Sequence, residues 1–134
     1  MEKRRVIIET PFAGNIGRNI RYTRACMRDC LINHNEIPFA SHLLYTQGGI
    51  LNDNDARERN LGIESGLVWA EFAETSVVYT DLGISGGMKL GIETAEKKGR
   101  KVEYRTLGED WEKESQELLN KSSNHPFVIN KVNM

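Results

Sequence analysis

The sequence predicts an α/β fold: a doubly wound, mainly parallel sheet of about four strands with helices on both sides. Three observations predict it. Short β-branched, apolar runs alternate with longer segments of helical periodicity. Each helical segment is long enough to carry the chain back for parallel pairing, and 134 residues suit a single domain. Four such strands commonly take the order 2-1-3-4 in the sheet.

The boundaries of the elements follow from local signals. Pro11 stops the first strand, and Gly99 is placed to end the third helix. The expected strands are residues 5–10, 37–40, 75–80 and 101–105. The expected helices are residues 16–33, a helix from an N-cap within 52–55 to about 73, and then 86–98 and 109–120. A loop containing His42 and Tyr45 is expected between the second strand and the second helix.

The second helix is expected to have one apolar side. The residues that form it are Leu61, Ile63, Leu67, Val68 and Phe72. We expect one domain over residues 1–108, followed by a C-terminal helix and tail over 109–134 that pack on the same or a neighbouring subunit. The tail at 122–134 contains Phe127-Val128-Ile129, and this apolar run makes a homodimer or a higher homo-oligomer a reasonable expectation.

Composition excludes several classes of protein. The net charge of −1 gives no case for a nucleic-acid binder, and no run approaches the ~20 apolar residues of a membrane span. We therefore expect a cytoplasmic protein. Cys26 and Cys30 predict buried free thiols, and no His or Cys cluster completes a metal site around them. The first strand is not followed by G-x-G-x-x-G, and there is no Walker A sequence, so no cofactor is expected.

Two glycine-bearing loops are expected to meet at the point where the strand order reverses. They are residues 10–14, after the first strand, and residues 81–88, after the third. Both lead into helix N-termini, where free backbone N–H groups and the helix dipole favour an anionic group. The pattern predicts a ligand site, and a phosphate or a carboxylate is the group it suits.

Five motifs, taken in order, resemble the nucleoside 2-deoxyribosyltransferase-like superfamily, and within it a branch of short bacterial and phage proteins. They are "ETPFAG", "NIRYTRAC", "IPFASHLLY", "NDNDARERNLGIESG" and "GISGGMKLGIETAEKKGRKVEY", within residues 5–105. The resemblance implies a Rossmann-like, commonly oligomeric fold. It also implies cleavage or exchange of the N-glycosidic bond of a nucleoside or nucleotide. The loop at 10–14 would approach the sugar or base, and the loop at 81–88 the 5′ end or its phosphate.

The expected ligand-binding residues come from both loops, the first helix and the segment after the second strand. They are Thr10, Pro11, Phe12, Gly14, Arg18, Asn19, His42, Ser85, Gly86, Gly87, Met88 and Lys89. Arg18 is a candidate for a phosphate contact or is simply an exposed arginine. His42 either contacts the base, donates a proton to it as it leaves, or has a structural role.

The resemblance also implies a carboxylate nucleophile in the first turns of the helix after the third strand. This sequence has Lys89 at that place, and its charge has the wrong sign to stabilise a developing cation. Glu93, one turn further along, is the catalytic candidate, and a surface glutamate is the alternative. Asp81 is a second candidate: it either binds a ribose hydroxyl and orients the site, or caps its loop.

Two classes of function follow. The first is an enzyme, an N-glycosidase or 2-deoxyribosyltransferase. The second is a catalytically inactive binder that senses or sequesters a nucleotide-derived signal, as a phage counter-defence protein would. A structural protein with a vestigial pocket is a third, plainer possibility. Lys89 is the residue that separates the first two classes, because a cation suits an additional phosphate better than it suits glycosidic cleavage.

Overall fold

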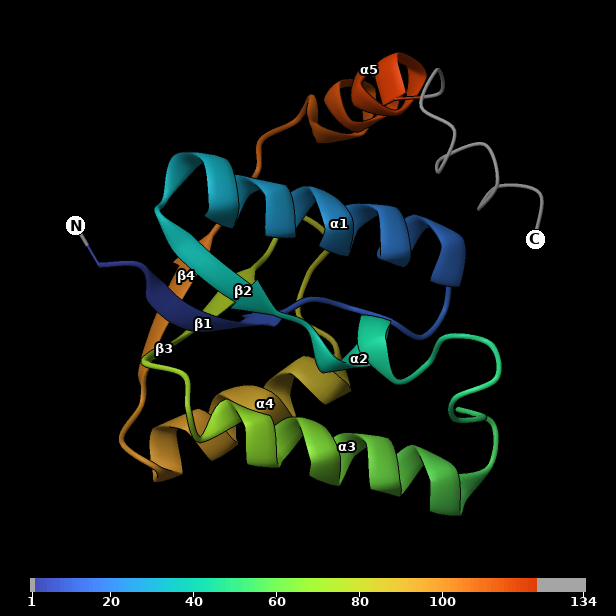
Figure 1. The fold of residues 1–134 in the computed structure, drawn as a ribbon, viewed down its shortest axis with the longest axis vertical. Coiled ribbons are helices and arrows are strands. Elements are labelled where there is room, and N and C mark those ends of the chain that lie inside the picture. The colour runs from blue at the N-terminus through green and yellow to red at the C-terminus, as the bar shows by residue number, and fades with distance from the viewer. Residues whose placement is uncertain (1, 123–134) are drawn as a thin grey trace.

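The computed structural model describes residues 2–122 and contains one all-parallel, four-stranded sheet in the order β2-β1-β3-β4 (Figure 1). The predicted fold class and strand order are confirmed. The strands are β1 (Arg4–Glu9), β2 (Glu36–Phe39), β3 (Thr75–Tyr79) and β4 (Lys101–Arg105). The helices are α1 (Ile16–Asn33), α2 (Ser41–Leu44), α3 (Ala56–Ala70), α4 (Gly86–Lys97) and α5 (Trp111–Ser122). Nothing expected of residues 123–134 can be compared, because they lie outside the described residues.

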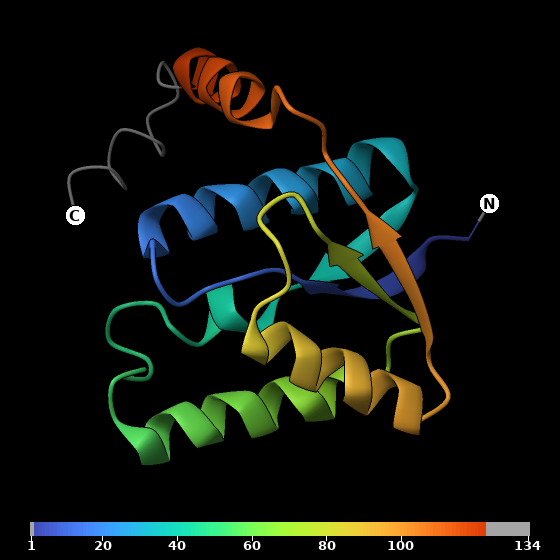
Figure 2. The same ribbon diagram turned by 180° about the vertical axis from the view of Figure 1, so that it is seen from behind.

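The helices lie in two layers, one on each side of the sheet. α1 and α5 lie on one side and α3 and α4 on the other, which both views show (Figures 1 and 2). The main core fills the space between the sheet and α1. Its buried members are Val6, Ile8, Tyr22, Cys26, Cys30, Val77, Tyr79 and Trp111. Both cysteines are free and buried, as expected. Burying side chains of this size contributes roughly 1.5–3 kcal/mol each, so this side of the sheet supplies much of the stability.

The other side of the sheet is packed differently, because α3 turns its small residues inward. Gly66 and Ala70 are buried, and a Cβ at Gly66 would lie 2.6 Å from the Oγ of Ser41 in α2. Large side chains do not fit where the two helices approach so closely. Leu61 and Val68 of α3, and Phe72 just after its end, are 52%, 60% and 63% exposed instead. The expected apolar side of this helix is therefore turned to solvent at these three positions.

Two smaller differences concern the segment after β2 and the end of the same helix. Residues 41–44, expected in a loop, form the short helix α2, and α3 ends at Ala70 rather than near residue 73. The N-cap lies within the expected range: the Asp55 side chain accepts hydrogen bonds from the backbone N–H groups of Arg57 and Glu58. No helix among the described residues is both long and apolar enough to cross a membrane.

Asp81, one of the two predicted catalytic residues, ties three elements together on the α1 side. Its carboxylate accepts a hydrogen bond of 2.5 Å from the Tyr22 hydroxyl. It also accepts bonds from the backbone N–H groups of Leu107 and Gly108, at 2.9 and 3.1 Å, in the connection to α5. Burial alone would raise the pKa of Asp81, but these hydrogen bonds outweigh it and hold the pKa below its ordinary value. The loop-capping alternative is the one that the structure supports.

Replacing Asp81 by alanine should therefore destabilise the fold. Two backbone amides and the buried phenol of Tyr22 would lose their acceptor, at a cost of roughly 2–4 kcal/mol. Urea denaturation measures the loss, and Glu96→Ala, an exposed acid on α4, is the matched control with an expected change near zero. Equal effects of the two substitutions would contradict the structural role of Asp81.

Candidate functional site

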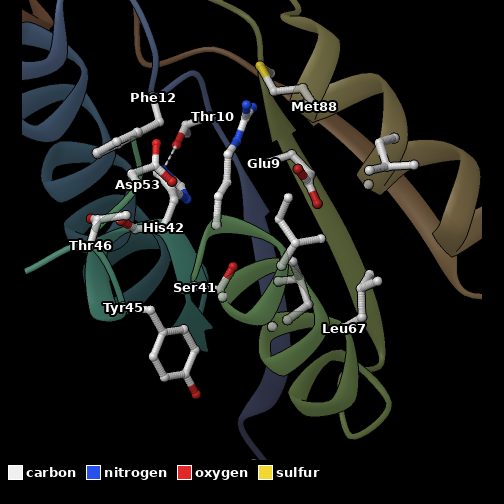
Figure 3. A pocket seen from close by; sticks show the side chains of 18 of the residues that line it. Glu9, Thr10, Phe12, Ser41, His42, Tyr45, Thr46, Asp53, Leu67 and Met88 are labelled. Carbon is white, nitrogen blue, oxygen red and sulfur yellow. Dashed lines mark hydrogen bonds between the residues drawn. The ribbon is translucent and has the colours of Figure 1, made fainter. Parts of the chain in front are cut away.

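A cavity of about 440 Å³ lies at the carboxyl ends of β1 and β2. α2, α3 and α4 enclose it (Figure 3). This is the place where ligands bind in open parallel sheets, next to the strand-order reversal between β1 and β3. The cavity exists because α3 presents Gly62, Gly66 and Ala70 to it, and α4 presents Gly86, Gly87 and Gly91. Larger side chains at these positions would fill the space.

Glu9, the last residue of β1, extends into this cavity. The side chains of β1 alternate, so that Val6 and Ile8 enter the main core while Ile7 and Glu9 line the cavity. A Cβ at position 91 would lie 2.2 Å from Oε2 of Glu9. The absence of a side chain at Gly91 is therefore what leaves room for the carboxyl group at this place.

The Glu9 carboxyl group has no hydrogen bond or ion pair with any residue of the described chain. No fully buried polar side-chain atom in residues 2–122 lacks a hydrogen-bond partner, so the Glu9 oxygens must be reachable from the cavity. Burial raises the pKa of Glu9 to about 8, and the nearby positive charge of Arg100 opposes this only in part. A carboxyl group with a raised pKa, unpaired in a cleft, is typical of an acid–base or nucleophilic site.

The N-terminus of α4 forms another wall. Ser85 caps the helix by accepting a hydrogen bond from the backbone N–H of Met88. A Cβ at Gly86 or Gly87 would meet no atom within 4 Å, so a ligand has room to approach the backbone there. The first backbone N–H groups of a helix have no partner within the helix and favour anions. Arg59 of α3 lines the same cavity and makes no ion pair with a described residue.

His42 lies on the wall opposite Glu9, beside Thr10, Phe12 and Asp53 (Figure 3). Its Nε2 atom is 2.9 Å from Oγ1 of Thr10, and its ring meets the ring of Phe12 edge-on, with the centroids 5.7 Å apart. Burial lowers the pKa of His42 to about 4. His42 is therefore neutral near pH 7, and it does not suit the role of proton donor that the sequence suggested.

The structure divides the predicted ligand-binding residues into two groups. Those that line the cavity are Thr10, Phe12, His42, Ser85, Gly86, Gly87 and Met88. Those that do not are Pro11, Gly14, Arg18, Asn19 and Lys89. Asn19 still shapes the site, because its Nδ2 donates to the backbone oxygens of Phe12 and Ala13 and so fixes the loop after β1.

The remaining predicted side chains are engaged or exposed elsewhere. Arg18 pairs with Glu112 at 3.1 Å and lies over the ring of Trp111. Lys89 and Glu93 are exposed on α4 and do not line the cavity. The geometry therefore supports neither Glu93 nor Asp81 as the catalytic carboxylate. No group of three or more His, Cys, Asp or Glu side chains within residues 2–122 could hold a metal ion.

Glu9 is not among the residues that the sequence predicts for the site, because residues 5–10 have the pattern of a plain buried strand. A signal was present: an acidic residue ends a run of apolar residues just before a loop that lines the switch point. Burying an unpaired carboxylate destabilises a protein, so a glutamate in that position indicates a function. Two further carboxylates, those of Asp53 and Glu58, also line the cavity.

The proximity of Glu9 and Gly91 predicts that their substitutions are coupled. Alanine is a better helix former than glycine, so Gly91→Ala in a Glu9→Ala background should stabilise by about 0.5–1 kcal/mol. With Glu9 present, the new methyl group must displace the carboxyl group, and the gain should be lost or reversed. A double-mutant cycle in urea measures this coupling, and the same gain in both backgrounds would contradict the contact.

Comparison with known proteins gives a family but no function. No curated protein and no solved structure matches the sequence. One family model does match, over residues 4–105, the segment from the start of β1 to the end of β4. This match covers most of the chain. The chain therefore belongs to the family described as a domain of unknown function, DUF7768.

Proposed function

We propose that the cavity binds a nucleoside or nucleotide and that Glu9 is the carboxylate that attacks its N-glycosidic bond. The single observation that carries the proposal is the unpaired Glu9 carboxyl group with its raised pKa, open to a cavity at the strand-order reversal. The ionised Glu9 carboxylate can stabilise the positive charge that develops on the sugar, whereas the cationic Lys89 cannot. The sequence motifs point to the same class of substrate.

The walls of the cavity suit the three parts of such a ligand. Phe12, His42 and Tyr45 offer rings on one side, suited to a base. Glu9 lies on the other side, suited to the sugar. The helix N-terminus at Gly86 and the guanidinium group of Arg59 both line the cavity, and either suits a 5′ phosphate. A volume of about 440 Å³ is within the range of small-molecule sites.

The chemistry would proceed in two steps. The ionised Glu9 carboxylate forms a bond to C1′ of the sugar while the bond from C1′ to the base nitrogen breaks. The electron pair leaves with the base, which takes up a proton from water in the cavity. Water, or the nitrogen of a second base, then attacks C1′ and releases Glu9. The first acceptor gives hydrolysis, and the second gives transfer.

A second candidate is a binding protein without catalysis, which senses or sequesters a nucleotide-derived signal. A pKa of about 8 favours this reading at neutral pH, because most Glu9 groups are then protonated and act as hydrogen-bond donors. The two candidates differ in their dependence on pH. Catalysis by ionised Glu9 should rise about tenfold per pH unit below the pKa and level off above it.

Incubating the protein with ribo- and deoxynucleosides and their monophosphates, with free base measured by chromatography from pH 6 to 9, tests the enzyme. We expect base release that increases with pH and falls about a thousandfold or more in Glu9→Gln. Glu93→Gln is the matched control, because Glu93 is exposed on α4, and it should leave the rate unchanged. Base release that survives in Glu9→Gln would contradict the assignment.

Stability separates loss of chemistry from loss of folding. The folded-state pKa of Glu9 lies above its unfolded value, so the native state loses stability as pH rises from about 4.5 to about 8. Glutamine carries no charge and avoids this loss. Glu9→Gln should therefore be more stable than the parent by roughly 3 kcal/mol at pH 7. Binding of a nucleotide without base release would favour the second candidate, and no binding at all would contradict both.

A further inference from the structure

Two threonine hydroxyl groups, those of Thr10 and Thr23, contact Nε2 of the His42 ring. Oγ1 of Thr10 lies 2.6 Å from Oγ1 of Thr23, and Oγ1 of Thr23 donates to the backbone oxygen of Asn19 at 2.9 Å. Thr10, Thr23 and Asn19 are all buried. Nε2 of His42 contacts both hydroxyls, at 2.9 and 3.3 Å. The ring therefore ends a buried hydrogen-bonded chain that begins inside α1.

Counting protons along this chain fixes the tautomer of His42. Each hydroxyl group donates one proton only. Thr23 donates to Asn19, so the proton between Thr23 and Thr10 must come from Thr10. The remaining short contact, between Oγ1 of Thr10 and Nε2 of His42, then needs a proton from Nε2. The opposite tautomer would leave one of the three short contacts with two lone pairs facing each other.

The other ring nitrogen, Nδ1, is then an unprotonated acceptor. It has no hydrogen-bond partner among the described residues. Since no fully buried polar side-chain atom in this part of the chain lacks a partner, Nδ1 is accessible. The cavity is the space that His42 borders, and Phe12 and Tyr45 border it alongside.

We propose that His42 determines ligand specificity: Nδ1 accepts a hydrogen bond from the exocyclic amino group of a base. This inference rests on the proposed nucleotide site. It assigns the amino group rather than a sugar hydroxyl because the aromatic wall is on the His42 side, while Glu9 is on the opposite side, suited to the sugar (Figure 3). A neutral imidazole held in one tautomer discriminates well, because a ligand without a donor leaves Nδ1 buried and unpaired.

The tautomer is tested first, in the free protein. Nitrogen-15 NMR of the histidine rings distinguishes a protonated from an unprotonated ring nitrogen. We expect His42 to carry its proton on Nε2 throughout pH 6–8, and to lose this strong preference in Thr10→Val, which removes the hydroxyl acceptor. A proton on Nδ1 of the parent protein would overturn the proposal, whatever the ligand proves to be.

Recognition is then tested with matched purine nucleoside monophosphates that differ only in an amino group: the adenosine and purine-riboside pair, and the guanosine and inosine pair. By calorimetry, we expect the amino form of at least one pair to bind about ten- to a hundredfold more tightly. His42→Phe should abolish this ratio, and His34→Phe, a change at an exposed histidine at the end of α1, should preserve it.

The results distinguish a wrong role for His42 from a wrong assignment of the nucleotide site. Equal affinities within both pairs, or a ratio that survives in His42→Phe, would overturn the role of His42 and leave the nucleotide site standing. If none of the four monophosphates binds, this inference fails, and the full panel of ribo- and deoxynucleosides and their monophosphates decides whether the proposed function fails as well.

Discussion

A half-buried carboxyl group without a hydrogen-bond partner, open only to a cavity, is the constraint around which one side of this structure is built. Glu9 ends β1 in a place where burial disfavours its charge, and the charge of Arg100 compensates for this only in part. Space for it depends on Gly91 of α4, because a side chain there would occupy the position of the carboxylate. The cavity next to it depends on the small residues that α3 turns inward. The unpaired carboxyl group and the unfilled cavity both lower the stability of the fold, and a ligand site is the physical reason that best explains them.

The opposite side of the sheet supplies the stability. α1 packs a continuous apolar core against β1 and β3, and the polar groups on that side are paired. Glu36 is fully buried, yet it forms ion pairs with Arg105, at 2.6 Å, and with Arg4. Burial works to raise the pKa of Glu36, but these arginines outweigh it and lower the pKa. Asp81 is satisfied in the same way. The contrast sets Glu9 apart: Glu36 and Asp81 have hydrogen-bond partners, and Glu9 has none among the described residues.

Sequence predicted the sheet and its order, because β-branched runs and helix lengths are local properties that the fold does not override. α1 and β4 begin and end at the predicted residues. The orientation of α3 was not predictable in the same way, because both of its sides are partly apolar and only the fit of Gly66 against Ser41 selects one. The role of Glu9 was not predictable for a related reason. Its carboxyl group has room in the cavity only because Gly91, on α4, has no side chain. Pairings of this kind depend on tertiary packing.

The most direct test of this account is the pKa of Glu9 itself. Carbon-13 NMR of the glutamate carboxyl groups, followed from pH 3 to 10, gives each titration curve, and the signal absent from Glu9→Gln identifies the residue. We expect this carboxyl group to titrate near pH 8. A midpoint near the ordinary glutamate value of about 4.3 would show a solvated or paired carboxylate, and the central role given to Glu9 would be contradicted.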